Sequence, residues 1–589
     1  ADTGSRRERV VLLGLILPGS VVDREAPLAE LRLLAETAVA EVVGALRAQN
    51  LAAPVGRVTG DLDERTIRLR GRLERPEFEA ARNSHVSIQL ALRSQEAVGD
   101  LWVDALPLTG PGMPIETVSV RWVEYVVVTS NTPNTPEEEL VRRAPALFPD
   151  ALLEEFPITV KKNETRALWI TVRVAANQEP GVYRGVLRLR QGAEPLAGIP
   201  YRLRVHAATV PSPVPLNITN YFNLSDAHLQ QFYGCAQFSD AWWELMRNLA
   251  RFMGRYHQTS IGANPVRLAQ AEVAGGALRY DFSHFERFVE TFQAAGVPGP
   301  IEGGNLMHRQ RVRNAPLMVR AWVLEGGRPQ LRDLERTDPG AREFLRTFLP
   351  QLYRLLERRG WTKLYLQGIL DEPHEWEREG FLETAELVRR LMPGVRTIEP
   401  VGARQDLGFM EKTVDIWVPQ LGTFDDKLEL LEAHVRRGGE VWFYTALSPR
   451  GRYMNRFIDY SLLKTRLLHW INFKYDFKGF LHWGGNFWGP EPFKDTQPVI
   501  NEGRTYLPPG DAYIVYPNRA RRSFWSSIRL EQMREGIEDF GLLRALAERD
   551  AEAARRIAGE AVESFTEYVR QPARFREIQR RLLEAASAR

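Results

Sequence analysis

The chain has 589 residues, of which 44% are hydrophobic and 26% charged, and its 78 basic and 75 acidic residues leave a net charge of +3. This length predicts two or three domains, and the composition is typical of globular proteins with sizeable cores. The interspersed charges argue against a nucleic-acid partner, no apolar run is long enough to predict a membrane helix, and the single cysteine, Cys235, excludes a disulfide framework.

Residues 1–54 form an amino-terminal segment to which the sequence assigns no clear role. A strand is expected over Val10–Leu17, and apolar residues at helical spacing predict a helix over 28–49. The basic start and short apolar run loosely resemble a signal peptide, although no small-residue cleavage site follows. The sequence is compatible with a secreted or periplasmic protein whose signal has been removed, and equally with a cytoplasmic one.

Residues 55–210 change to short alternating segments separated by turn residues. Alternation of apolar and polar side chains is typical of strands with one buried face, and such strands in series predict an antiparallel β-sandwich. The segments are 85–94, 118–130, 167–176, 181–191 and 199–210. A proline-rich stretch, "TVPSPVPL" (209–216), then predicts a stiff linker.

Strands alternate with helices over residues 216–550. The strands are expected at Leu216–Phe222, Thr259–Asn264, Pro300–Leu306, Lys363–Leu370, Arg396–Pro400, Val414–Leu421, Glu440–Ala446 and Gly479–Phe487. Helices are expected between them at Asp240–Tyr256, Ser283–Ala295, Arg342–Arg359, Glu377–Leu391, Asp425–Arg437 and Ile458–Lys474. This pattern predicts a (β/α)8 TIM barrel, with an open doubly wound sheet as the alternative because the fifth strand is weak. A helical pattern continues from about Ser526 to Arg589, and this tail is expected to pack on the outside, with residues 551–589 as a carboxyl-terminal helical extension.

The stretch "LYLQGILDEPHEW" (364–376) places two acids directly after an apolar strand. Asp371 and Glu372 follow the fourth predicted strand, and Pro373 prevents its continuation. An acidic turn that caps the next helix would be the simplest interpretation. Catalytic groups of such barrels, however, lie at the carboxyl ends of the strands, and adjacent acids there cost stability unless they have partners or a task. The position therefore favours a catalytic pair.

Polar and aromatic residues also follow other predicted strands: Asn264, Glu302, Gln420, Tyr444, Trp483, Asn486 and Trp488. Aromatic faces that stack on sugar rings, with amides and carboxylates that bind hydroxyls, are typical of carbohydrate sites. The sequence contains no HExxH, no P-loop and no GxGxxG between a strand and a helix, so no metal and no cofactor is predicted. Trp417, Trp442, Trp470 and Trp525 are expected in the core, and Arg529, Glu531 and Arg534 in a structural ion-pair network.

Several longer blocks resemble a known family. "LYLQGILDEP", "VDIWVPQL", "FLHWGGNFW" and "SSIRLEQMREGIEDFGLL" are similar to glycoside hydrolase family 123 and its relatives of unknown function, as is "LWITVRVAANQEPGVYRGVLRLR" in the amino-terminal half. The likeness covers roughly residues 75–550 and implies a β-sandwich before a catalytic barrel. It further implies a retaining β-N-acetylgalactosaminidase that acts on glycan ends, with its neighbouring Asp and Glu at Asp371 and Glu372.

The resemblance implies substrate-assisted catalysis, which explains why the two acids are adjacent. A conventional retaining glycosidase needs carboxyls on opposite faces of the anomeric carbon, whereas an acetamido oxygen of the substrate can replace the nucleophile. Glu372 would protonate the leaving oxygen and then activate water, and Asp371 would accept a hydrogen bond from the acetamido N–H. We expect Glu372 to be the group protonated near neutral pH.

The remaining candidates would contact the sugar. Tyr444 would donate to the acetamido carbonyl, Trp483 and Trp488 would wall the subsite, and Asn264, Gln420 and Asn486 would bind hydroxyls. Two alternatives remain open: a glycosidase for a sugar without the acetamido group, with Glu302 as the second carboxylate, or a non-catalytic carbohydrate-binding protein. The exact sugar, the anomer, exo or endo action and the oligomeric state are not predicted.

Overall fold

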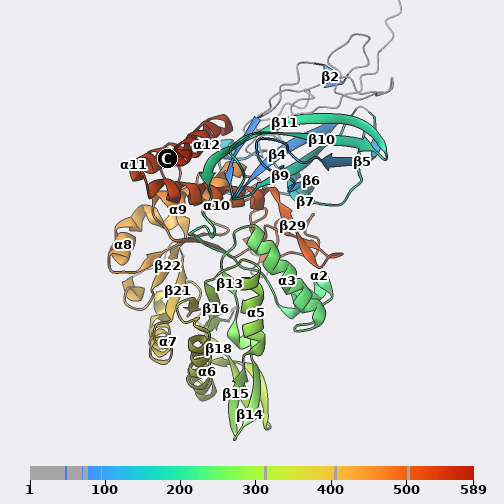
Figure 1. Ribbon diagram of the computed structural model, residues 1–589. Helices are drawn as coiled ribbons and strands as arrows, with labels where there is room; N and C mark the ends of the chain where they lie inside the picture. Colours follow the sequence, from blue (N-terminus) through green and yellow to red (C-terminus); the bar gives the residue numbers. More distant parts are fainter. Residues whose placement is uncertain are drawn as a thin grey trace, which may run out of the picture.

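The computed structural model describes residues 77–94, 96–310, 315–402, 408–500 and 505–588, together with two short paired strands, β1 (Arg47–Ala48) and β2 (Leu69–Arg70) (Figure 1). The predicted strand over Val10–Leu17 lies outside the described residues. So does the predicted helix over 28–49 except at 47–48, where the chain is a strand instead.

The amino-terminal region consists of two sheets that share one hydrophobic core. One sheet has the order β3 (Glu77–Arg82), β11 (Glu194–Thr209), β10 (Gly181–Gln191), β5 (Val98–Ala105), β8 (Ile158–Val160). The other has the order β28 (Tyr516–Asn518), β29 (Ser523–Ser527), β7 (Ala146–Leu153), β6 (Val118–Val128), β9 (Thr165–Val174), β4 (Ser84–Arg93). Side chains of both sheets, including Ile170 on β9 and Leu187 on β10, pack in the same buried cluster.

Alternation explains why these strands form where the sequence predicts them. Along β10, Tyr183, Leu187 and Leu189 are buried while Arg184 and Arg188 are exposed. Each fully buried Leu contributes roughly 1.5–3 kcal/mol, so a register shift by one residue would lose the whole set. All five predicted strands occur, and the expected β-rich amino-terminal region is confirmed. The strands β28 and β29 were not predicted there, since they come from a segment more than 300 residues later in the chain.

Parallel strands follow in the second region. They pair in two runs, the first being β12 (Asn217–Asn220), β25 (Gly479–His482), β24 (Phe443–Thr445). The second is β13 (Ile261–Gly262), β16 (Ile301–Asn305), β20 (Tyr365–Gly368), β21 (Arg396–Val401), β22 (Ile416–Pro419), β23 (Glu440–Val441). Each of the eight predicted strands overlaps one of these, with β21 one residue longer than predicted, and the seventh is divided into β23 and β24 at Trp442.

Backbone hydrogen bonds connect the two runs at both ends. The N–H groups of Thr259 and Ser260 donate to the carbonyl of Ile218 on β12, at 3.1 and 3.2 Å. At the other end Trp442, between β23 and β24, donates to Trp417 on β22 at 2.9 Å. The strands β12 and β22 therefore each have hydrogen-bonded neighbours on both sides. In an open sheet with β12 at its edge, β12 would have a neighbour on one side only.

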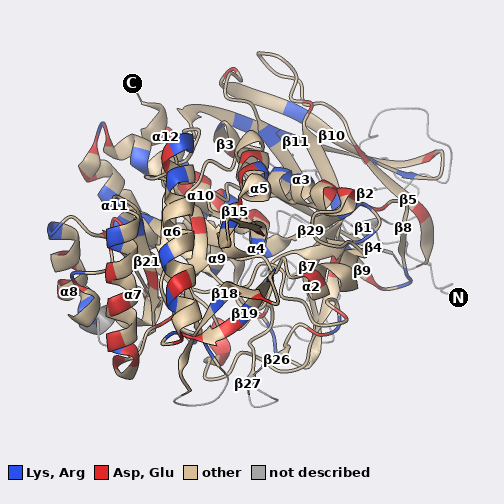
Figure 2. Cartoon of the chain, turned by 90° about the horizontal axis from the view of Figure 1, so that it is seen from below, with Lys and Arg blue, Asp and Glu red and all other residues tan. Residues whose placement is uncertain are grey.

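The six predicted helices occur with their bounds shifted by no more than a few residues. They are α3 (Asp240–Arg255), α5 (Ser283–Ala294), α6 (Pro339–Arg359), α7 (Arg378–Leu391), α8 (Phe424–Arg436) and α9 (Leu462–Lys474). Side-chain caps fix several starts: Ser239 accepts from Trp242 N at α3, and Asp338 accepts from Gly340 N at α6. Charged residues of both signs are interspersed over the outer helices, as Figure 2 shows for α7 and α11 (Ala551–Ala561).

The prediction from apolar periodicity did not include several short elements between these helices. They comprise the helices α2 (Asp226–Tyr233) and α4 (Pro265–Leu268), the hairpin β14 (Gln270–Ala274) with β15 (Ala277–Asp281), and the small sheet β17 (Met307–Arg309), β18 (Leu317–Glu325), β19 (Arg328–Glu335). The hairpin residues are mostly exposed, so they have little apolar alternation to reveal them.

The carboxyl-terminal helices are α10 (Ile528–Ala547), α11 and α12 (Pro572–Ser587). The expectation that this tail packs on the outside is wrong for α10, which lies between the two regions and contacts α9, β4 and β7 (Figure 1). Its charged residues are buried because they are paired: Arg529 binds Asp150 at 2.8 Å, and Glu531 binds Arg121 at 2.7 Å. The predicted ion-pair network is thus confirmed.

Trp417, Trp442 and Trp470 are fully buried, as predicted, and Trp525 is half-buried against the same core. Among the described residues, no helix combines the length and the apolar character that a bilayer crossing requires.

Candidate active site

The acidic pair lies in a turn just beyond the carboxyl end of β20. The strand ends at Gly368, and the next two residues, Ile369 and Leu370, are buried. Asp371 and Glu372 then follow, and Glu372 has a φ of 46°, in the left-handed region that side chains other than glycine rarely occupy. Such a conformation persists only where the surroundings impose it, and such residues are enriched at functional sites.

Arg309 on β17 supplies part of those surroundings. Its guanidinium donates to the backbone carbonyl of Asp371 at 2.5 Å and to that of Glu372 at 2.8 Å. The same guanidinium forms two bonds, of 2.6 and 2.7 Å, to the Glu377 carboxylate, which also accepts from the N–H of His374 at 2.8 Å. Burial alone would raise the pKa of Glu377, but the hydrogen bonds from Arg309 hold it below its ordinary value. Arg309 and Glu377 therefore fix the turn that presents both acids.

The carboxyl group of Asp371 has a pKa raised to about 6. The largest cause is partial loss of hydration, because the side chain, although still exposed to solvent, lines a concave cavity; the charge of Glu372 raises the pKa further, and Arg309 opposes the shift. The sequence predicted that the shared proton would reside on Glu372. The structure instead raises the pKa of Asp371, because this is the acid that faces the cavity.

Tyr444, on β24, contacts the acidic pair through Glu372. Its hydroxyl donates to Oε1 of Glu372 and accepts from Nε2 of Gln420 at 3.3 Å. Burial first, and then the negative charge of Glu372, raise the pKa of Tyr444 well above its ordinary value, so the hydroxyl keeps its proton. Gln420, Tyr444 and Glu372 are thus joined by hydrogen bonds, from the residue that follows β22 to the turn that follows β20.

Glu399 lies beneath the turn on β21 and is fully buried. Its Oε1 accepts from the N–H groups of Ile369 and Leu370, the latter at 3.2 Å. Burial raises the pKa of Glu399 well above its ordinary value, and its Oε2 has no hydrogen-bond partner among the described residues. The side chain thus satisfies the two donors that β20 leaves unpaired as it ends.

A cavity of about 350 Å³ opens at the carboxyl ends of β12, β13, β16, β20 and β21. Its lining mixes aromatic faces with amides and carboxyls, among them Tyr221, Asn264, Glu302, Asn305, Asp371 and Phe487. The size is that of a small-ligand pocket, and the residue types fit a sugar.

Glu302 lies deeper in the cavity and is already hydrogen-bonded. Thr219 donates to its Oε1 at 2.6 Å and Tyr221 to its Oε2 at 2.8 Å. Burial raises the pKa of Glu302 despite these bonds. The side chain is therefore placed to accept hydrogen bonds within the cavity.

Two family models match the chain. The catalytic domain of glycoside hydrolase 123 matches residues 225–546, which is more than half of the chain, and the glycoside hydrolase 123 N-terminal domain matches residues 67–191. The chain belongs to glycoside hydrolase family 123. Its acidic pair, Tyr444 and most of the cavity lining fall within the catalytic match, whereas Tyr221 and the other lining residues at 219–224 lie just before it.

One solved structure shares the fold of this chain. A family 123 glycoside hydrolase from Clostridium perfringens matches with a TM-score of 0.67 at 15% identity, over 87% of this chain and 93% of that one. A family 39 glycoside hydrolase from Bacteroides cellulosilyticus reaches 0.33 at 10% identity, over 78% and 81%. A family 5 xyloglucanase from Bacteroides ovatus reaches 0.25 at 9%, over 79% and 98%, and neither of these low scores supports an argument. No curated protein sequence matches the chain.

The sequence-predicted residues of this family 123 enzyme separate into two groups. Asp371, Glu302 and Asn264 line the cavity, and Glu372, Tyr444 and Gln420 are linked at its edge. The side-chain oxygen of Asn264 caps α4 by accepting from Arg267 N at 3.1 Å.

The second group comes from the loop after β25. Trp488 is buried among His228, Phe232 and Phe524, and its indole donates to Val515 O at 2.7 Å. Asn486 is fully buried and accepts from the N–H of Asn223 at 2.5 Å. Neither lines the cavity, so the expected sugar contacts of Trp488 and Asn486 find no support; both side chains are already packed and paired.

Trp483 belongs to neither group, because it does not line the cavity but packs against a residue that does. It is half-buried, donates to Asp511 at 3.1 Å and packs against Phe487, which lines the cavity. It therefore positions an aromatic residue of the wall.

The sequence reasoning missed four residues that shape the site: Tyr221, Arg309, Glu377 and Glu399. Tyr221 directly follows β12, so the rule that selects strand ends could have found it. Arg309 lies on a strand of three residues, the bond of Glu377 to His374 indicates only a local cap, and the partners that give Glu377 and Glu399 their place in the site are far along the chain.

Proposed function

We propose that this glycoside hydrolase removes terminal β-linked N-acetylgalactosamine from glycans, with retention, by substrate-assisted catalysis. The observation that supports this most is the adjacency of Asp371 and Glu372 on one constrained turn at the cavity. Two neighbouring carboxyls reach the same side of a reaction centre, whereas a protein nucleophile would have to face its acid across the anomeric carbon. The Clostridium perfringens relative is described as acting on glycolipid glycans, which is consistent with this class of substrate.

In the first step the acetamido oxygen of the substrate attacks the anomeric carbon while the glycosidic bond breaks. Glu372 gives its proton to the departing oxygen, and Asp371 accepts a hydrogen bond from the acetamido N–H as charge develops on the oxazolinium. In the second step Glu372 takes a proton from water, which attacks the anomeric carbon and restores the acetamido group. Two inversions at that carbon give net retention.

Substrate binding would place the proton where this chemistry needs it. Before binding, Tyr444 donates to Glu372, and the raised pKa keeps a proton on Asp371 below about pH 6. In the complex, the acetamido N–H donates a hydrogen bond to Asp371 and so favours its charged form. The hydroxyl of Tyr444 can then donate to the acetamido carbonyl instead of to Glu372. Both exchanges favour transfer of the shared proton to Glu372.

We further propose that the parallel strands form the (β/α)8 barrel and the two amino-terminal sheets a β-sandwich. The pairing of β12 with β25 and its bonds to Thr259 and Ser260 support the barrel, and the shared core supports the sandwich. The division into 1–54, 55–210, 216–550 and 551–589 is kept, although β28 and β29 fall within 216–550 and pair with each other and with β7 of the amino-terminal region.

A screen of aryl glycosides tests the proposed function. Wild type should hydrolyse the aryl β-N-acetylgalactosaminide, and Glu372→Gln and Asp371→Asn should each reduce kcat/KM at least about a hundredfold. Near wild-type rates in both variants would overturn the proposal. The second candidate is a glycosidase for a sugar without the acetamido group, favoured by the place of Glu302 in the cavity. Activity on a plain β-galactoside that survives Asp371→Asn and is lost in Glu302→Gln would support it instead.

A further inference from the structure

Glu538, on α10, is a buried carboxylate that forms no ion pair with a lysine or an arginine among the residues that the structure describes. The other acids of this helix are paired: Glu531 with Arg121 and Arg534, and Glu535 and Asp539 with Arg466. Glu538 is only 3% exposed, and within the described parts of the chain its only ion pairs are with two histidines. A buried carboxylate needs a compensating charge. Arg534 and Arg466 act on Glu538 only at longer range, so the compensating charge in contact with it would be a protonated histidine or a bound cation.

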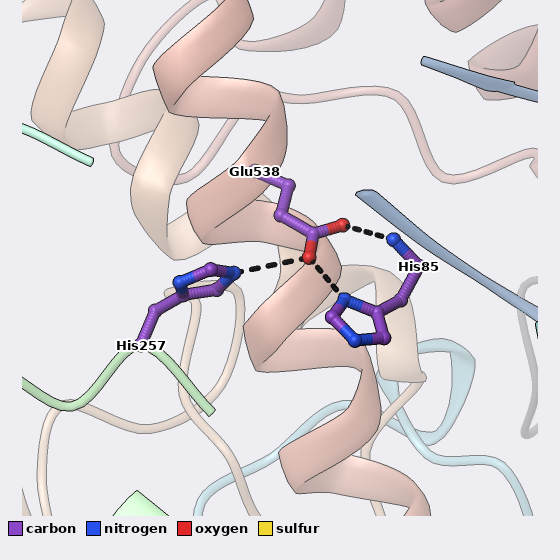
Figure 3. A group of neighbouring side chains, drawn as sticks. All are labelled: His85, His257 and Glu538. Atoms are coloured by element: carbon purple, nitrogen blue, oxygen red, sulfur yellow. Dashed lines mark hydrogen bonds and ion pairs between the residues drawn. The ribbon is translucent and has the colours of Figure 1, made fainter. Parts of the chain in front are cut away.

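The two histidines converge on this carboxylate from different parts of the fold (Figure 3). Nδ1 of His85, on β4, lies 2.7 Å from Oε1 of Glu538, and Nε2 of His257, just after α3, lies 3.1 Å from the same oxygen. The backbone N–H of His85 donates to the other oxygen at 2.9 Å, which fixes the carboxylate. The three ligand atoms lie within 4.8 Å of one another, and among the described residues no other such group of three occurs.

We propose that His85, His257 and Glu538 bind a divalent transition-metal ion, Zn²⁺, that links the amino-terminal sheet, the loop after α3 and helix α10. Two histidines and a carboxylate are a ligand set that zinc prefers, and its fourth position then takes water. Ligand atoms around tetrahedral zinc lie about 3.3 Å apart, so the imidazoles would move away from Oε1 by roughly 0.6 and 0.2 Å, and the two imidazole nitrogens, now within 4.8 Å of each other, would take the same separation.

Access agrees with this assignment. His85 and His257 both line a cavity of about 800 Å³ between the two regions, so an ion and a water ligand can reach them. None of the three residues lines the active-site cavity, so the ion would have a structural role.

Metal binding to the untagged, chelator-treated full chain tests the proposal. Titration calorimetry should give one Zn²⁺ per chain with micromolar or tighter affinity, and Co²⁺ should show the visible absorption of a tetrahedral site. A hundredfold excess of Zn²⁺ over its Kd should raise Tm by about 3 °C. Glu538→Gln and His257→Asn should each weaken binding at least tenfold; asparagine suits the φ of 52° at position 257, so that variant keeps the backbone.

His206→Asn is the matched control, because His206 pairs with Glu79 at 2.8 Å without a third ligand. It should leave affinity and the cobalt spectrum unchanged. Absence of zinc binding by the wild type would contradict the proposal and leave a trio held by hydrogen bonds alone. Binding of equal strength in His257→Asn and Glu538→Gln would contradict it as well, since the ion would then lie elsewhere.

Discussion

The hydroxyl of Tyr444 donates a hydrogen bond to the carboxylate of Glu372, which lies 72 residues earlier in the chain. Tyr444 is itself held by Gln420, and its raised pKa keeps it a donor. A buried donor aimed at one member of the acidic pair is available to stabilise negative charge or to bind the substrate carbonyl.

Tyr444→Phe tests this role. The variant keeps the ring packing and removes only the hydroxyl, so we expect kcat/KM for an aryl β-N-acetylgalactosaminide to fall about ten- to a hundredfold with little change in Tm. Steady-state kinetics and a thermal melt measure the two effects. Tyr201→Phe, whose buried hydroxyl has no partner among the described residues, is the control and should retain full activity. Equal activity of Tyr444→Phe and wild type would contradict a role for the hydroxyl.

The pH dependence of activity should report on Asp371. Its raised pKa of about 6 means that the acidic pair loses its shared proton as pH rises above this value, and Glu372 then has no proton to give to the departing oxygen. We therefore expect kcat/KM to fall as pH rises through about 6 and this limb to disappear from this pH range in Asp371→Asn. A limb that persists in the variant would assign the titration to another acid, with Glu302 and Glu399 as the nearest groups of raised pKa.

The same pKa shift predicts how stability depends on pH. Between the ordinary value of 3.8 and about 6, the folded state binds more protons at Asp371 than the unfolded state does. The contribution of Asp371 to the unfolding free energy is therefore lost as pH rises through this window. Asp371→Asn lacks this loss, so its Tm should match wild type near pH 4 and exceed it at pH 7. A Tm difference independent of pH would show that the charge of Asp371 is not the cause.

Arg309 is expected to act through position rather than contact. Arg309→Ala removes two bonds to the carbonyls of the acidic pair and leaves Glu377 buried without its partner, so we expect a loss of about 2 kcal/mol in unfolding free energy and at least a tenfold loss in kcat. Arg309→Lys should not restore kcat, because an ammonium cannot reproduce the forked geometry. Denaturant unfolding and kinetics measure both.

Arg332→Ala is the control for Arg309. Arg332 belongs to the same small sheet and pairs with Glu325 at 2.8 Å, but both side chains are about half exposed. Exposed pairs contribute roughly 0–1 kcal/mol, so this variant should behave like wild type. Identical behaviour of the two alanine variants would show that Arg309 does not fix the turn.

Sequence periodicity located the main elements because their burial is periodic. The alternation along β10 and the helical spacing of α3 and α5 require one buried face, and they predicted bounds within a few residues. The hairpin β14–β15 has little buried surface, and β28 and β29 pair with each other and with β7, more than 300 residues away. Nothing local in the sequence encodes such pairings.

In the active site, too, the sequence revealed the residues that a local pattern places and missed those that depend on distant partners. The strand-end rule selected Asp371, Glu302 and Asn264, which do line the cavity, since the carboxyl ends of parallel strands meet at one edge. It also selected Trp488 and Asn486, because it does not reveal which side of a loop a side chain faces. Arg309 and Glu399 act through partners 62 and 29 or more residues away, so only the folded chain shows them.

Substrate assistance is the central claim, and the most direct test is kcat/KM for aryl β-galactosaminides whose N-acyl group carries zero to three fluorines. Fluorine withdraws electrons from the acyl oxygen and weakens it as a nucleophile, while the leaving group and the protein stay the same. If the acyl oxygen attacks the anomeric carbon, kcat/KM should fall steadily and by at least about a hundredfold from acetyl to trifluoroacetyl. Rates that do not change along the series would contradict the account, because the nucleophile would then be a group of the protein.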